Sequence, residues 1–210
     1  MKINKFLFRS ACAIAAAAAL CAPMLANAES TLQTGAGTLS GVARLDFRVT
    51  VPKFLFLQVG TGTSMASNAT INLIDFTVPA ANVGDGSVIA ATLASGDIGT
   101  GAVTAKVAGN NGIITLTSTT LGALGNGSGD TISYAQISTA AAVLTSAVAL
   151  PHPALVDGVT TSTTVSPVGK IVNRDAKWTF SFLNSTLVAP GTYGGINAQN
   201  SRVTYTASMP

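Results

Sequence analysis

Cysteine is missing from most of this sequence. Cys12 and Cys21 both lie within the first 28 residues, so residues 29–210 contain no thiol. That excludes disulfides and thiolate metal sites from this region. His152 is the only histidine, so a zinc site would also lack nitrogen ligands. We therefore predict no metal and no cofactor, and we expect the fold to be held by its apolar core alone.

Residues 1–28 are typical of a secretory signal peptide. Lys2, Lys5 and Arg9 form a basic start, Ala11–Leu20 is an apolar run, and Ala26-Asn27-Ala28 is a small-x-small cleavage site. We expect cleavage after Ala28 and export from a bacterial cell, first to the periplasm and then to the cell surface or beyond.

Charge is also scarce, at 9% of the residues. Three of the 11 basic residues lie in the leader and all 8 acidic residues follow it, which leaves eight of each sign and a net charge of zero. The basic isoelectric point therefore gives no reason to expect nucleic acid as a partner. No segment after the leader is long and apolar enough to predict a transmembrane helix.

Residues 42–51 alternate more clearly than their surroundings. Ala43, Leu45, Phe47, Val49 and Val51 fall on one side, while four of the five residues on the other side are polar, the exception being Val42. This period of two predicts a strand with one apolar edge, ended by Pro52. The strand has two interpretations: it is the first strand of its own domain, or it is an arm that fills a groove in a neighbouring molecule. Residues 29–41, rich in Ser, Thr and Gly, are expected to be flexible.

Short alternating segments separated by turn residues predict an all-β fold, an antiparallel β-sandwich in a single domain at residues 52–210. The predicted strands are 53–59 (buried on both faces), 69–78, 87–93, 102–108, 113–118, 131–137, 159–165, 177–183 and 202–209. Gly109–Gly112 predicts a hairpin between 102–108 and 113–118, and 138–150 is open between helix and strand. The predicted core consists of Leu55, Leu57, Ile71, Leu73, Val103, Val107, Ile114, Leu116, Ile132, Trp178, Phe180, Val203 and Tyr205.

The last 33 residues resemble the ending of bacterial fimbrial subunits. An aromatic alternating strand begins at Trp178, Pro190-Gly191-Thr192-Tyr193-Gly194-Gly195 follows, and Arg202–Ala207 reads Arg-Val-Thr-Tyr-Thr-Ala. These features are similar to spore-coat-U-like pilins of archaic chaperone–usher systems, which also begin with an alternating donor segment. The resemblance implies an immunoglobulin-like sandwich that lacks one strand, with like subunits, a periplasmic chaperone and an usher as partners. Two differences are the missing disulfide and the 13 residues at 29–41.

No catalytic constellation is evident. His152 lies between two prolines, a position that predicts a surface loop. The acidic residues are scattered among turn residues and form no cluster in the sequence. We therefore expect no enzyme activity. The resemblance implies a structural subunit of a surface fibre that polymerises by donor-strand addition through Ala43, Leu45, Phe47, Val49 and Val51, with a role in adhesion or biofilm. The alternative is a self-contained secreted or surface β-sandwich protein. Carbohydrate binding is one option for such a protein, and it would require an exposed aromatic platform such as Trp178 or Tyr193.

Overall fold

The computed structural model describes residues 29–210, so the predicted signal peptide at 1–28 lies outside the described residues. The chain divides into two units, Met1–Val51 and Pro52–Pro210, and the assigned strands all lie in the second. As predicted, the fold is nearly all β, with 31% strand and 3% helix. Within residues 29–210, no helix has the length and hydropathy that crossing a membrane requires.

Every strand pairing is antiparallel. The strands are β1 (Leu55–Val59), β2 (Ile89–Ala90), β3 (Ala102–Gly109), β4 (Ile114–Thr119), β5 (Leu124–Gly125), β6 (Thr131–Ile132), β7 (Ile137–Ala142), β8 (Thr160–Val165), β9 (Val172–Phe182) and β10 (Thr204–Ser208). Two short 3-10 helices, Ala80–Asn82 and Tyr134–Gln136, interrupt them.

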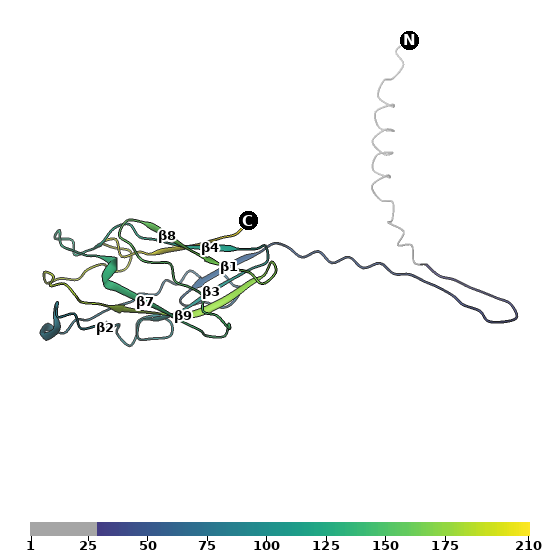
Figure 1. Cartoon of the computed structure of the whole chain (residues 1–210), viewed down its shortest axis with the longest axis horizontal. Helices are drawn as coiled ribbons and strands as arrows, with labels where there is room; N and C mark the ends of the chain where they lie inside the picture. Colours follow the sequence, from purple (N-terminus) through teal and green to yellow (C-terminus); the bar gives the residue numbers. More distant parts are fainter. Residues whose placement is uncertain (1–28) are drawn as a thin grey trace, which may run out of the picture. The chain divides into compact units, whose positions relative to one another are not determined.

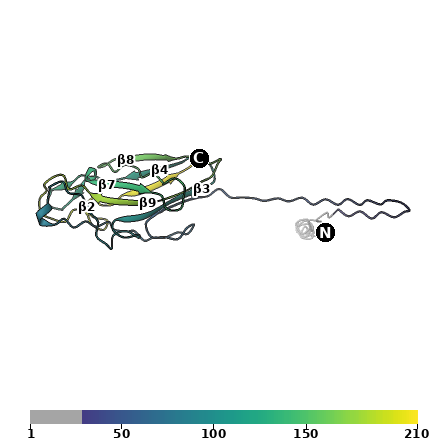
Figure 2. The ribbon, with the colours of Figure 1, turned by 60° about the horizontal axis from the view of Figure 1, so that its bottom comes forward.

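Two sheets carry most of these strands. One has the order β1-β3-β9-β2, with β7 also paired to β9, and the other has the order β10-β4-β8. Figures 1 and 2 show β4 and β8 on one side of this unit and β3 and β9 on the other. β5 and β6 form a separate two-stranded ribbon. β1 and β10 are each hydrogen-bonded on one edge only, which makes them edge strands.

Both sheets contribute to one apolar core. Trp178 of β9 is its largest fully buried side chain, and the indole Nε1 donates a hydrogen bond to the carbonyl oxygen of Leu150 at 2.8 Å. Burial of the predicted core residues is confirmed for Val103, Val107, Ile114, Leu116, Trp178 and Phe180. Leu57, Ile132, Val203 and Tyr205 are half-buried. The prediction is wrong for Leu55, Ile71 and Leu73, which are exposed.

The predicted hairpin at Gly109–Gly112 is also wrong. β3 and β4 lie where the alternation places them, but β3 pairs with β1 and β9, whereas β4 pairs with β8 and β10. The four-residue turn therefore connects two sheets instead of two neighbouring strands. Val107 and Ile114, on either side of the turn, both point into the core. Burying both apolar faces against each other outweighs local pairing across the turn.

Three further segments differ from prediction. Residues 69–78 alternate in burial, with Ile74 and Phe76 packed on the core, but they form no strand. β1 was predicted to be buried on both faces, yet none of its residues is buried, because it lies at a sheet edge. The open segment 138–150 contributes β7 and then a loop.

The outer face of the β10-β4-β8 sheet carries three rows of hydroxyl side chains. The strand registers align these residues across all three strands, with side chains that point away from the core. The rows are Thr204–Thr119–Thr160, Thr206–Thr117–Ser162 and Ser208–Thr115–Thr164. Threonine suits this position because its branched side chain fits an exposed strand and pairs across neighbouring strands.

Candidate functional site: the arm and the open sheet edges

The arm, residues 42–51, presents an apolar edge that nothing covers. Phe47 is 86% exposed, and Leu45, Val49 and Val51 are between 73% and 85% exposed. No strand is assigned to the arm, and within residues 29–210 it takes part in no backbone–backbone hydrogen bond. The strand predicted at residues 42–51 is therefore not formed in this structure, and all ten of its residues are exposed. A row of large exposed apolar side chains such as this one is typical of an interaction site.

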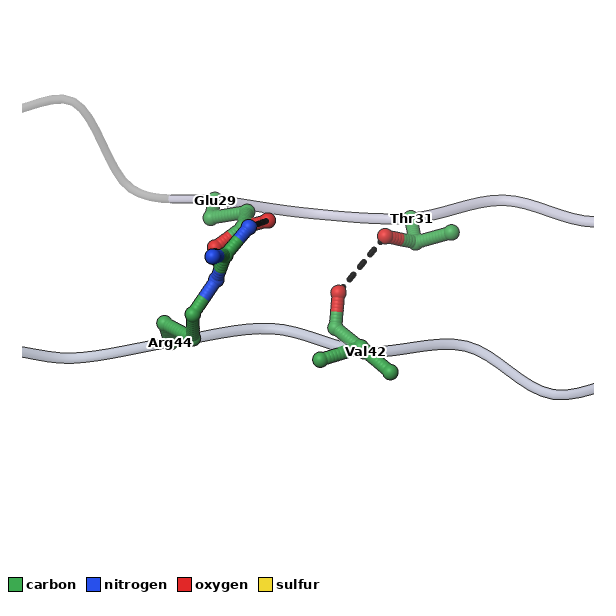
Figure 3. Close-up of polar contacts among 4 residues, drawn as sticks. All are labelled: Glu29, Thr31, Val42 and Arg44. Carbon is green, nitrogen blue, oxygen red and sulfur yellow. Dashed lines mark hydrogen bonds and ion pairs between the residues drawn. The ribbon is translucent and has the colours of Figure 1, made fainter.

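The start of the arm is held by the residues that precede it. Arg44 donates to the Glu29 carboxylate through Nε and Nη2, both at 2.7 Å, and Thr31 Oγ1 donates to the Val42 carbonyl oxygen at 2.6 Å (Figure 3). The ion pair lowers the pKa of Glu29. Residues 29–41 were predicted to be flexible, and these contacts are a feature that the sequence analysis missed. A Glu and an Arg fifteen positions apart give no local signal.

Open edges are the second feature, and they lie within residues 52–210. The free edges of β1 and β10 leave backbone N–H and C=O groups without ladder partners, and the two strands are neighbours in space. Val203, Tyr205, Ala207 and Met209 all fall on the inner side of β10 or its flanks, but they stay half-buried. In β9, by contrast, Trp178 and Phe180 are buried. The core is therefore incompletely covered along the free edge of β10.

A shallow hollow lies beside β1. It is bordered by Phe54–Leu57 on one side and by the loop residues Met65–Asn68 on the other. Phe54, Leu55 and Met65 all expose more than a third of their surface. The hollow is open, and no ionisable side chain borders it.

His152 is half-buried and packs against rings of the core, although its flanking prolines predicted a surface loop. Its ring stands edge-on to Trp178 at 4.6 Å between centroids, and to Phe180 at 5.4 Å. Nε2 shares a 2.7 Å hydrogen bond with the Tyr205 hydroxyl. Neither a serine nor a carboxylate is hydrogen-bonded to His152 in the described structure, so it lacks the partners of a nucleophilic site. Burial lowers the pKa of His152 to about 4.

This pKa predicts a loss of stability in mild acid. An unfolded histidine titrates near 6.5 and the folded one near 4, so the unfolded state binds more protons between these values and stability falls as the pH falls. From pH 7 to pH 4 the expected loss in free energy of unfolding is about 3 kcal/mol. Urea denaturation at stepped pH measures it. His152→Gln should flatten the profile between pH 6.5 and 4, and an unchanged profile in that variant would contradict the assignment.

Asp175 is the one buried carboxylate within residues 29–210, and its role is structural. It accepts hydrogen bonds from the backbone N–H groups of Thr145 and Ser146, both at 2.9 Å, and from the Thr145 hydroxyl. Burial alone would raise its pKa, but these hydrogen bonds lower it to about 2. Asp175 thus fastens the loop after β7 onto β9. No group of three or more metal-binding side chains occurs anywhere in residues 29–210.

The aromatic stripe of β9 is not a sugar-binding platform. Trp178, Phe180 and Phe182 are all buried, and Tyr193 is half-buried with its hydroxyl donating to the Ala189 carbonyl oxygen at 2.8 Å. Stacking on a sugar needs an exposed ring face. These residues therefore do not support the carbohydrate-binding alternative.

Comparison with known proteins adds no identification. No protein-family model, no curated protein and no solved structure matches this chain. Any functional proposal therefore depends on the arm and on the open edges of β1 and β10.

Proposed function

We propose that this chain is an exported structural subunit of a bacterial surface fibre, and that it polymerises by inserting its arm between β1 and β10 of the next copy. The observation that supports this most directly is the exposed apolar edge of the arm, in a chain that also has two neighbouring open sheet edges. Each feature alone would favour aggregation. Together, the arm can supply a strand, and the open edges can supply backbone hydrogen-bond partners and an apolar surface.

The two features match in spacing. The arm offers Leu45, Phe47, Val49 and Val51 at a period of two, and β10 with its flanks has four half-buried inner positions at the same period, 203, 205, 207 and 209. An added strand would complete the ladder of β10 and cover these positions. Each large apolar side chain buried in this way contributes about 1.5–3 kcal/mol.

The strand order supports an immunoglobulin-like sandwich without its last strand. In the constant-type fold one sheet has the order A-B-E-D and the other contains C, F and G. Here β1-β3-β9 follows A-B-E, and β4 with β10 follows C-F. No strand lies on the free edge of β10 in the described chain, which is the position of G. The arm of another copy would take that position.

This mechanism implies particular partners and a particular location. Donation from one copy to the next is head to tail, so it extends into a fibre and does not close into a ring. Before assembly the uncovered core would need protection, which a periplasmic chaperone would provide, with an usher at the outer membrane. The finished fibre would stand on the cell surface and serve in adhesion or biofilm.

Deleting residues 29–51 tests the proposal. The truncated subunit is expected to be unable to form fibres, to aggregate on its own, and to gain stability when a synthetic peptide of residues 42–51 is added. Thermal denaturation with and without the peptide measures the gain, and a peptide with Phe47→Asp serves as the control. A truncated subunit that is a stable monomer and ignores the peptide would show that strand donation is wrong.

A further inference from the structure

Residues 29–44 fold back on themselves and form what we name the hook. Besides the Glu29–Arg44 ion pair and the Thr31–Val42 hydrogen bond, the Ser40 N–H donates to Gln33 Oε1 at 3.1 Å. Gly37 has φ of +116°, a conformation that L side chains rarely adopt, and it lies in the reversal between the two segments. Figure 3 shows the segments around Glu29 and Arg44 running side by side.

The hook divides the arm into a held part and a free part. Its contacts involve the side chain of Arg44 and the carbonyl of Val42, and they stop there. Residues 45–51 form no hydrogen bond or ion pair within residues 29–210. All four large apolar side chains of the donor edge lie in this free part, and Ala43 is the one donor-edge residue inside the hook.

The length of the free part matches its proposed binding site. Seven residues of strand extend about 23 Å, at roughly 3.3 Å per residue. Residues 203–209, which carry the four half-buried positions, are likewise seven residues. Residues 45–51 are therefore long enough to span these positions, and the hook begins directly before them.

An alternating arm needs such a boundary. A shift by two residues keeps every apolar side chain on the same face, so alternation alone does not exclude it. A shift of the arm back toward its own domain would replace Val51 with Ala43 in the groove, a change of two methyl groups, and would also draw in Arg44. The space between β1 and β10 would take one strand, and the hook at Val42 and Arg44 is two segments wide, so the hook would have to open first.

We propose that the hook is a stop that fixes how far the arm can slide back through the groove of the next subunit, with Glu29, Thr31 and Arg44 as positioning residues. This inference rests on the proposed donor-strand function. It assigns residues 29–41 a role in setting register, and it makes Leu45 the residue that occupies the end of the groove next to the hook.

Disulfide mapping in the full chain tests the stop. Since residues 29–210 contain no cysteine, Val49→Cys can be combined in turn with Val203→Cys, Tyr205→Cys, Ala207→Cys or Met209→Cys, and the disulfide between copies identified by mass spectrometry of the polymers. With the hook intact, one position on β10 should account for nearly all of the cross-linked product. Arg44→Glu, which places two carboxylates face to face, should spread the product over two positions two residues apart.

The charge-reversed pair Glu29→Arg with Arg44→Glu is the matched control. It restores the ion pair and should restore the single cross-link, while the mass of each subunit checks that its N-terminus is unchanged. A single cross-link in Arg44→Glu polymers would overturn the stop and leave strand donation standing. If Arg44→Glu forms no polymers while the charge-reversed pair does, the hook is needed for assembly itself. That result would also overturn the stop. If the parent chain forms no polymers, strand donation fails, and the stop with it.

Discussion

Replacing Phe47 by Asp is expected to abolish polymers and to leave the subunit as stable as before. In the subunit this side chain is 86% exposed, so an exposed carboxylate replaces an exposed ring at little cost. In the proposed groove the same carboxylate would lie among apolar side chains without a partner, which costs several kcal/mol. Size-exclusion chromatography and electron microscopy follow the polymers, and thermal denaturation follows the subunit.

Thr50→Asp is the matched control for Phe47→Asp. It adds the same charge three positions along, on the polar edge of the arm. Polymers should therefore persist, with at most a modest change in yield. Equal loss of polymers in both variants would assign the effect to charge on the arm in general. Polymers that survive Phe47→Asp would rule out the apolar edge as the donor.

Replacing Trp178 by Ala is expected to remove about 3–5 kcal/mol from the free energy of unfolding. Trp178 has no exposed surface, and it contacts the rings of His152 and Tyr205 as well as the Leu150 carbonyl. Its removal leaves a large cavity in the core that both sheets share. A loss of this size is comparable to the whole stability of many domains. Urea denaturation of the purified variant measures it.

Two further variants serve as comparisons for Trp178→Ala. Trp178→Phe keeps most of the apolar volume but leaves the Leu150 carbonyl without its donor, so it should cost less, about 1–3 kcal/mol. Lys177→Ala changes the neighbouring residue, which is not part of the core, and should stay within about 0.5 kcal/mol. A Trp178→Ala loss below 1 kcal/mol would mean that the core is not built around this side chain.

The sequence predicted individual strands better than their partners. Period-two alternation places β8, β9 and β10 correctly to within a few residues, because it follows from which face is buried. The hairpin predicted at Gly109–Gly112 is wrong, because turn residues do not determine whether the next strand pairs beside the last one or crosses to another sheet. That choice depends on residues far along the chain, such as those of β9 and β10.

The same limit applies to the candidate site. The apolar edge of the arm could be predicted from residues 42–51 alone, because the pattern lies within one segment. The burial of His152 could not, because the rings that cover it come from Trp178, Phe180 and Tyr205. The hook could not be predicted either, because its ion pair joins two residues across a glycine-containing reversal. Contacts between distant positions are the information that a single sequence does not contain.

The three hydroxyl rows on the β10-β4-β8 sheet should make the hydration of that face insensitive to pH and salt. None of the nine side chains ionises in ordinary buffers, and each hydroxyl both donates and accepts hydrogen bonds. Acid that protonates His152 or Asp175 would weaken the interior but would leave the charge of this face at zero. Salt has no charge there to screen. Wetting of the face should therefore stay constant from acidic to alkaline water and from fresh water to brine.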